Sequence, residues 1–539
     1  MENEENVKKK GMPSVTRREA LKLSGKVLGG LVIGGVMISQ EVGKALADDD
    51  CQSQCPDGPA CNWGNFDKTQ HYSYLGDLDA FYPVDTSTDT TISKLDENEM
   101  RITFMGSSVP PNSRRVQQMM SIFVEVGWDK DKQMPVDQFV FDCGSGVWGN
   151  YNAMNVSLGR MDKIFLTHLH GDHMSDLTHI YCFGPSADRK SPLFVWGPKN
   201  SGVKSPRGGH YDDGVKAFCR HLRKACRWHT ESFSFISTSY SDYVPPTKES
   251  WGLPHKPSPG GGDHNNDAYA MIPIELNWKK YGKKPDDNIA YNNAKTGVKI
   301  THFPVIHARK GSMGYKLEWT SPDGKVLSMI YTGDTKPENH SVSQAENDGN
   351  GVDVFIHEMS LPAEVWSFKG MNLTEPPSDT PEWEGIVEYT KMVQNSSHTP
   401  QGAFGYLLSQ INPRPRLTIA CHFPVDDETV ECATESVQAH FPNETVYQGN
   451  DAPQNAVRMT WAFDRMVITV SKDNIIERIG DVSDFSNPAK NNMPSIDLNT
   501  PKYHDKNGNG DPYAQIDRST EIPSCNEATG ECNYREDGY

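Results

Sequence analysis

The segment FLTHLHGDHMSD, residues 165–176, places three histidines and an aspartate within six positions: His168, His170, Asp172 and His173. Imidazole nitrogens and carboxylates are ligands for divalent metal ions, and the run follows a short apolar stretch that predicts a buried strand. At the end of a strand, His168 and His170 can point the same way while Asp172 and His173 turn toward an adjacent point. Two neighbouring ions would suit this arrangement if other segments supply the missing ligands.

Three later residues of ligand type also follow predicted strands. His307 ends the run ITHFPVIH, Asp334 lies in YTGDT just beyond an apolar run, and His422 ends LTIACH. A solvated polar loop would not predict such a set, whereas strand ends that meet at one edge of a sheet would bring it together. The sequence therefore predicts a centre for two metal ions.

Apolar strand-like runs alternate with helical stretches, which predicts an α/β sandwich with its site along one sheet edge. The predicted strands, with their turns, cover 100–108, 119–127, 138–146, 163–168, 192–198, 297–307, 313–319, 326–335, 352–358, 416–423 and 456–473. The predicted helices cover 174–183, 210–229 and 401–411.

The order of the ligands resembles the metallo-β-lactamase superfamily over roughly residues 99–475, and the opening ITFMGSS…FVFDCGSG is similar to that family's first strands and glycine turn. The resemblance implies a four-layer αβ/βα sandwich with an insertion over the active-site edge. It implies one zinc ion on His168, His170 and His307, and a second on Asp172, His173 and His422. Asp334 would bridge the pair together with a water or hydroxide. Manganese or iron could occupy the same ligands.

Three motifs resemble the phosphodiesterase, ribonuclease Z and arylsulfatase-like branch of this superfamily. Gly-Asp-Thr at the bridging Asp334 is typical of it, FIHEMS (355–360) resembles its His-Glu-Ala-Thr motif, and SSHTPQGA (396–403) resembles its His-Ser-Thr motif. By this resemblance His398 is the general acid that protonates the leaving oxygen, with Glu358 as its helper. Met359 and Ser360 depart from the motif, so a purely structural role for Glu358 stays open. Asp172 completes the candidate catalytic residues.

Two zinc ions lower the pKa of bound water and neutralise charge on ester oxygens, which suits a phosphate or sulfate ester better than a neutral amide. We therefore expect an exported binuclear zinc hydrolase of a small anionic ester, a phosphodiester or a sulfate ester, in which a metal-bridging hydroxide attacks. A ribonuclease Z-like nuclease or a lactonase of the same fold are alternatives. A di-iron redox enzyme is another alternative. In di-iron enzymes of this fold, however, the ligand segment resembles H-x-E-x-D-H, with glutamate in place of His170, and they carry a flavin domain not found here.

A long nucleic-acid partner is not expected. The formal net charge is −18, and phosphate binding needs clustered lysine and arginine. Family members that clamp tRNA carry a long arm between a Gly-Tyr pair and Gly-Asp-Thr, whereas residues 316–332 leave room here for a hairpin only.

Residues 1–47 resemble a twin-arginine signal peptide, with Arg17 and Arg18, a short glycine-rich apolar run, and a small-residue cleavage site at Ala45–Ala47. The resemblance implies export by the twin-arginine machinery to the periplasm or the cell exterior, with no permanent membrane span after cleavage. A plain membrane anchor is the alternative. Eleven cysteines fit an oxidising compartment; Cys219 and Cys226 are one plausible pair, but the pairing cannot be deduced from sequence.

Four segments follow: the signal peptide over 1–47, an irregular cysteine-containing leader over 48–95, the metallo-β-lactamase domain over 96–480 with an insertion at about 201–294, and a polar tail over 481–539. The helix predicted in the insertion is either an anion clamp or a solvated face, and its basic residues are His210, Arg220, His221, Arg223, Arg227 and His229. In the tail, DKNGNGD resembles the start of a calcium loop, with Asp505, Asn507 and Asn509 at alternating positions. A flexible polar turn is the other interpretation, because an EF-hand places glutamate where Ile516 stands.

Overall fold

The structure is a computed structural model that describes residues 82–85, 95–110, 116–232, 240, 242–259, 267–282, 284–371, 373, 380–453 and 455–481, and 503–504, 510–511 and 529 near the C-terminus. The chain divides into two units, residues 1–482 and 483–539. In the second unit, β18 (Tyr503–His504) pairs antiparallel with β19 (Gly510–Asp511). The signal segment 1–47 and the candidate calcium ligands Asp505, Asn507 and Asn509 lie outside the described residues.

The first unit contains two large sheets. Nine strands form the first, in the order β1 (Tyr82–Asp85), β17 (Ile475–Asp481), β16 (Met466–Val470), β2 (Met100–Gly106), β3 (Ser121–Val126), β4 (Asp137–Phe141), β5 (Lys163–Phe165), β6 (Leu193–Pro198) and β7 (Met271–Leu276). Eight form the second, in the order β14 (Val446–Tyr447), β15 (Val457–Trp461), β13 (Leu417–Cys421), β12 (Val354–Glu358), β11 (Val326–Tyr331), β10 (Met313–Thr320), β9 (Val298–Pro304) and β8 (Ile289–Asn293).

Helices connect these strands. The α-helices are α2 (Val147–Ala153), α3 (Gly171–Met174), α4 (Leu177–Ala187), α5 (Val215–Ala225), α6 (Arg227–Ser232), α7 (Asn339–Glu346), α8 (Ala363–Gly370), α9 (Pro381–Ser397), α10 (Gln401–Gln410) and α11 (Asp427–Gln438). Short 3₁₀ turns cover Leu158–Arg160, Trp278–Lys280, Pro285–Asn288 and Asn347–Gly349. Within the described residues, no helix combines the length and the apolar character that crossing a membrane requires.

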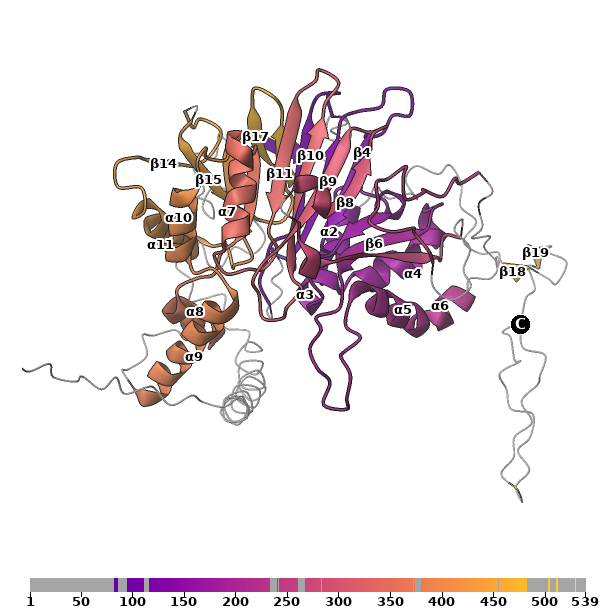
Figure 1. Ribbon diagram of the computed structural model, residues 1–539, viewed down its shortest axis with the longest axis horizontal. Helices are drawn as coiled ribbons and strands as arrows, with labels where there is room; N and C mark the ends of the chain where they lie inside the picture. Colours follow the sequence, from indigo (N-terminus) through magenta and orange to yellow (C-terminus); the bar gives the residue numbers. More distant parts are fainter. Residues whose placement is uncertain are drawn as a thin grey trace, which may run out of the picture. The chain divides into compact units, whose positions relative to one another are not determined.

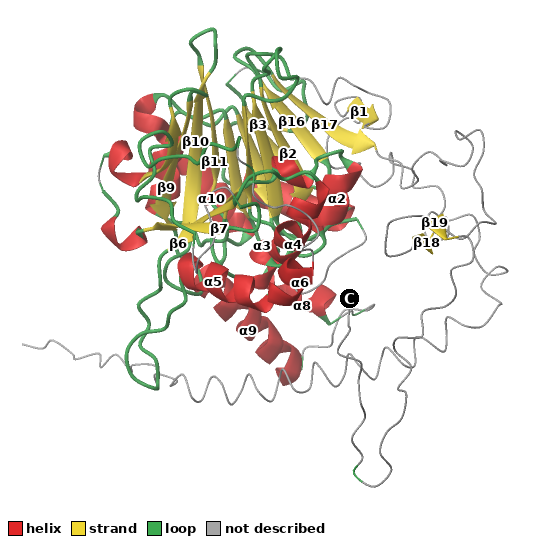
Figure 2. Ribbon diagram, turned by 90° about the vertical axis from the view of Figure 1, so that its right-hand side faces the viewer, coloured by secondary structure: helices red, strands yellow, loops and turns green. Residues whose placement is uncertain are grey.

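The alternation of side chains along the strands explains the layers. In β4, Phe139 and Phe141 point into an apolar core shared by both sheets, while Val140 between them joins a second core beneath α2, α4 and α5. On the far side of the second sheet, Ala345 of α7 and Phe404 of α10 pack against the strands. Figure 2 shows the strands in the middle with helices flanking them. The predicted four-layer αβ/βα sandwich is confirmed.

The topology gathers strand ends at one edge. In the second sheet, β11, β12 and β13 are parallel neighbours, so their C-terminal ends meet side by side. In the first sheet, β4 and β5 are likewise parallel. The residues directly after these five strands therefore face one another across the edge where the two sheets meet.

Some features of the fold were not apparent in the sequence. Within the segment 201–294, β7 extends the first sheet beside β6, and β8 pairs with β9. The helix predicted over 210–229 is divided into α5 and α6 at Cys226. Between Glu358 and His398, the packed pair α8 and α9 forms a helical hairpin that the sequence analysis did not anticipate. The predicted hairpin over 316–332 is present as β10 and β11.

Candidate metal centre

Three histidines converge at the first half of the centre. His168 Nε2 lies 3.0 Å from His170 Nδ1, and His307 Nε2 lies 3.1 Å from the same atom. The opposite nitrogens of two rings have other partners: His307 Nδ1 donates to the carbonyl oxygen of Ser397 at 2.9 Å, and His168 Nδ1 lies 3.1 Å from Thr167 Oγ1. The inward nitrogens therefore present lone pairs to one point, as ligands of a cation do.

Two carboxylates and two histidines form the second half. His173 Nε2 lies 3.1 Å from Asp172 Oδ2 and 3.2 Å from Asp334 Oδ1, and His422 Nε2 lies 3.2 Å from Asp172 Oδ2. Despite these short distances, the buried His173 Nε2 makes no hydrogen bond of acceptable geometry. A buried polar atom without such a bond is costly unless something else satisfies it, and a metal ion at this point would do so.

Asp334 lies between the two halves. Its Oδ2 is 3.7 Å from His307 Nε2 and 4.0 Å from His168 Nε2 on one side, and 3.5 Å from His422 Nε2 on the other. The structure therefore brings together all seven candidate metal ligands, with Asp334 in the bridging position: His168, His170, Asp172, His173, His307, Asp334 and His422.

The backbone after two strands is shaped to present these ligands. Gly333, between β11 and Asp334, has φ +60°, and a Cβ there would lie 2.6 Å from Thr167 Cβ, so only glycine fits. His422 itself has φ 67°, an uncommon conformation for a residue with a side chain, and its N–H donates to the Ser107 carbonyl at 3.0 Å. Such conformations cluster at functional sites because the surrounding structure must hold them.

Asp142, which the sequence analysis did not single out, holds the centre from behind. It is fully buried directly after β4, and its Oδ2 accepts hydrogen bonds at 2.8 Å from His173 Nδ1, Thr167 Oγ1 and Tyr331 OH. Its Oδ1 accepts from Thr167 N at 2.8 Å. With Nδ1 donating to Asp142, a neutral His173 turns a bare Nε2 toward the centre. An aspartate between a buried strand and a glycine turn was the available sequence signal.

The electrostatics of the two halves differ. Burial, followed by the neighbouring His173, holds the pKa of His168 well below its usual value, and burial followed by His307 lowers the pKa of His170. In the second half burial also opposes charge on His422, but Asp334 and the hydrogen bond to Asp172 outweigh it and raise its pKa to about 10. The first half thus offers neutral nitrogens, while in the second half the carboxylates favour protons on the histidines that a divalent cation would replace, so the residues fit a metal pair.

His398 and Glu358 form a pair beside this centre. His398 caps the C-terminal end of α9, and its Nδ1 donates to Glu358 Oε2 at 2.8 Å. The imidazole ring lies 5.0 Å from that of His307, centroid to centroid, and stacks 5.9 Å from that of His422. Burial opposes a charge on His398, but the charge and hydrogen bond of Glu358 outweigh it and raise the His398 pKa. Glu358 is fully buried and also accepts a hydrogen bond from Thr335 N.

Two basic residues of the insertion have partners outside the metal centre. Arg220 forms an exposed ion pair with Asp212 at 2.7 Å, and His229 Nε2 lies 2.7 Å from the carbonyl oxygen of Cys182 in α4. Instead, Arg309, two residues after His307, reaches the insertion through an ion pair with Asp213. The contacts of Arg220 and His229 give no support to an anion clamp at the metal centre.

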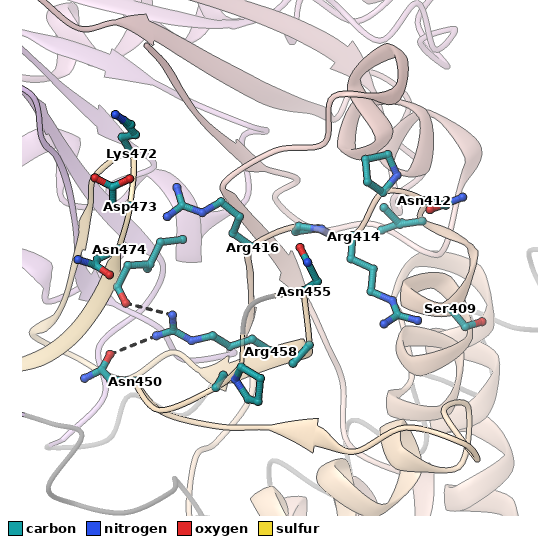
Figure 3. Close-up of a pocket in the computed structure, with 17 residues that line it drawn as sticks. Ser409, Asn412, Arg414, Arg416, Asn450, Asn455, Arg458, Lys472, Asp473 and Asn474 are labelled. Atoms are coloured by element: carbon teal, nitrogen blue, oxygen red, sulfur yellow. Dashed lines mark hydrogen bonds between the residues drawn. The ribbon is translucent and has the colours of Figure 1, made fainter. Parts of the chain in front are cut away.

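A separate cavity of about 1180 Å³ lies between the start of β13 and the turn that joins β16 to β17 (Figure 3). Since His422 follows the other end of β13, this cavity is not part of the metal centre. Figure 3 shows Arg458 donating to Asn450 and to a backbone carbonyl, that of Ile475. The arginines that line this cavity form ion pairs with carboxylates: Arg414 with Glu444, Arg416 with Asp353 and Arg458 with Glu477.

No family model matches the chain. Ribonuclease Z of Halalkalibacterium halodurans is 33% identical to it over 269 residues, which cover 48% of this chain and 74% of that protein. Ribonuclease BN of Proteus mirabilis is 26% identical over 268 residues, which cover 49% of this chain and 77% of that protein. Among solved structures, the metallo-β-lactamase-fold protein YhfI from Bacillus subtilis shows 12% identity and a TM-score of 0.39, covering 69% of this chain and 100% of that chain.

Proposed function

Because this chain belongs to the ribonuclease Z-like family of metallo-β-lactamase-fold proteins and is a metal-dependent hydrolase of ester bonds, we propose that it hydrolyses a small phosphodiester with two bound zinc ions. The observation that carries this proposal is the convergence of seven ligand side chains, with Asp334 between the two halves and the His398–Glu358 pair beside them. Imidazole and carboxylate ligands favour zinc, and manganese or iron suit the same set.

The pair of ions supplies activated water as the nucleophile and positive charge opposite the ester oxygens. The protein's own residues do the rest. One ion would be held by His168, His170 and His307. The other would be held by Asp172, His173 and His422, and both would be held by Asp334. Asp142, Ser397 and Thr167 fix the orientation of the ligating rings through the hydrogen bonds described above.

His398 is the proposed general acid. Its Nδ1–H is bound to Glu358, so protonated His398 has its remaining proton on Nε2, available to the leaving oxygen. The raised pKa of His398, caused by the charge and hydrogen bond of Glu358 against the effect of burial, favours the protonated ring. Glu358 is a positioning residue, because it acts on the substrate only through His398.

Two substrates with different leaving groups test these roles. p-Nitrophenolate leaves readily without a proton, whereas the alkoxide released from a dinucleotide needs one. We expect His398→Gln to lower the turnover of a dinucleotide by about 100-fold or more, and that of bis(p-nitrophenyl) phosphate much less. Asp334→Asn should abolish the turnover of both substrates and lower the bound metal. The matched control is His179→Gln, a half-buried histidine of α4 that stacks on Trp148.

Equal losses on both substrates for His398→Gln would remove the general-acid role. No turnover of either ester, nor of p-nitrophenyl sulfate, by protein loaded with zinc or manganese would overturn small-ester hydrolysis. Two irons and no zinc in protein purified from its native compartment would favour the redox alternative instead.

Cleavage of RNA is the second candidate, favoured by the ribonuclease Z and ribonuclease BN relatives. The short β10–β11 hairpin and the net charge of −18 weigh against a long RNA substrate. Cleavage of precursor tRNA at a higher kcat/KM than that of a dinucleotide would reverse this order.

Export by the twin-arginine route, with the mature protein in the periplasm or outside the cell and not spanning the membrane, is also part of the proposal. Its support is the motif around Arg17 and Arg18 and the cysteine content. Replacing both arginines by lysine should retain the protein in the cytoplasm, as cell fractionation would show. Unchanged export of that variant would exclude the twin-arginine route.

A further inference from the structure

Two cysteines meet where α4 packs against the junction of α5 and α6. The thiol of Cys182 in α4 lies beside that of Cys226, the residue between α5 and α6, in one buried cluster. Both side chains are buried, with relative exposures of 7% and 8%, and both are free thiols. Two neighbouring thiols are the starting arrangement for a disulfide, whose sulfur atoms are about 2.05 Å apart.

The surrounding contacts hold the two segments against each other. His229 Nε2, in α6, lies 2.7 Å from the carbonyl oxygen of Cys182, and the His229 ring packs 4.9 Å from that of Phe183. The hydroxyl of Tyr269 donates to the same carbonyl at 3.4 Å. These contacts keep α4 and the start of α6 packed together around the two thiols.

Cys219 is not a partner for Cys226, although the two are close in sequence. They lie seven residues apart along α5, which places them about 10 Å apart along the helix axis. The Cα atoms of a disulfide are about 4.4–6.8 Å apart. The helix therefore excludes the pairing that proximity in sequence indicated, whereas Cys182 lies beside Cys226.

We propose that Cys182 and Cys226 form a disulfide when the folded protein meets an oxidised thiol–disulfide couple. The thiolate of one cysteine attacks an external disulfide and expels one external thiol. The thiolate of the second cysteine then attacks the protein sulfur of the mixed disulfide and expels the other. Two protein thiols are oxidised and one external disulfide is reduced to two thiols, so the exchange balances.

The cross-link would join helices that flank two ligand-bearing segments. α4 follows α3, which carries Asp172 and His173. α5 begins just after Asp213, whose carboxylate pairs with Arg309 beside His307. A bond between these helices restricts the unfolded chain more than the folded one, so it should raise the melting temperature without changing the centre's geometry.

Peptide mapping of the full-length purified protein tests the proposal. The protein is incubated with oxidised glutathione or with dithiothreitol, its remaining thiols are alkylated, and the digest is analysed by mass spectrometry without reduction. We expect a linked pair of peptides containing Cys182 and Cys226 after oxidation only. The oxidised protein should melt about 4 °C above the reduced one.

Cys182→Ser and Cys226→Ser should each abolish this difference in melting temperature, whereas Cys219→Ser, a buried cysteine of the same helix, should retain it. The wild-type peptide map does not depend on whether these variants fold. Oxidised protein with a native circular-dichroism spectrum would overturn the proposal if Cys182 and Cys226 were both alkylated, or if either were linked to a different cysteine. The outcome is independent of ester hydrolysis.

Discussion

Replacing Asp142 by asparagine perturbs the metal centre through a residue that is not itself a candidate ligand. In the variant an NH₂ group takes the place of Oδ2, which accepts hydrogen bonds from Thr167 Oγ1, Tyr331 OH and His173 Nδ1. The two hydroxyls can rotate and accept instead. His173 can accept only by moving its proton to Nε2, the atom that faces Asp172 and Asp334.

The expected magnitude follows from this change of tautomer. A hydrogen bond to a charged acceptor contributes about 1.5–3 kcal/mol, and loss of such a partner typically weakens metal binding by about 10–100-fold. We therefore expect Asp142→Asn to bind one zinc ion about 10–100-fold more weakly than the wild type and the other nearly unchanged. Competition with a chromophoric zinc chelator measures both affinities.

Asp137, the first residue of the same strand, provides the matched control. It is also buried, and it accepts hydrogen bonds from Tyr291 OH and Thr296 Oγ1 at 2.7 and 2.8 Å. Asp137→Asn should lower the free energy of unfolding but leave both zinc affinities within about 2-fold. If folded Asp142→Asn bound both ions as tightly as this control, the argument from the His173 tautomer would be refuted.

Three further outcomes are expected. Gly333→Ala should lower stability by roughly 2–3 kcal/mol and reduce bound zinc, because φ is +60° and the new Cβ would meet Thr167 2.6 Å away; an unchanged thermal melt would show that the loop can shift. Removing metal with a chelator should lower the melting temperature, and zinc at 100 times its Kd should restore about 2.7 kcal/mol; identical melting with and without metal would contradict the site. Burial raises the pKa of Asp464 to about 7 despite the hydrogen bonds it accepts from Gln118 N, Ser107 Oγ and Asn150 Nδ2. Since the folded state then binds this proton more tightly than the unfolded chain, its contribution to stability is full below about pH 4 and falls by about 3 kcal/mol between pH 4.5 and 7.5. Urea denaturation at these two pH values should show a smaller fall for Asp464→Asn than for the wild type.

The sequence by itself determined the features that are local in the chain. Residues 165–176 hold four ligand-type side chains directly after a strand, so their proximity needs no tertiary information. The apolar runs identified the strands, and residues just beyond them, such as Asp334 and His422, became candidates because parallel strands end at a shared edge. The α/β sandwich followed from the alternation of strands and helices, and the resemblance to the metallo-β-lactamase superfamily implied its four layers, which are confirmed.

Only the tertiary structure decided which distant residues support that local cluster. Asp142 contacts His173 and Tyr331, which are 31 and 189 residues away in the chain, and His307 contacts the carbonyl of Ser397, 90 residues away. Cys226 likewise meets Cys182 in another helix and not its neighbour in sequence. Periodicity specifies which face of a strand or helix is buried, but the residue lying opposite depends on how all the layers pack. The ligands could therefore be read from the order of residues, while the proton positions that make them ligands depend on contacts formed only when the chain is folded.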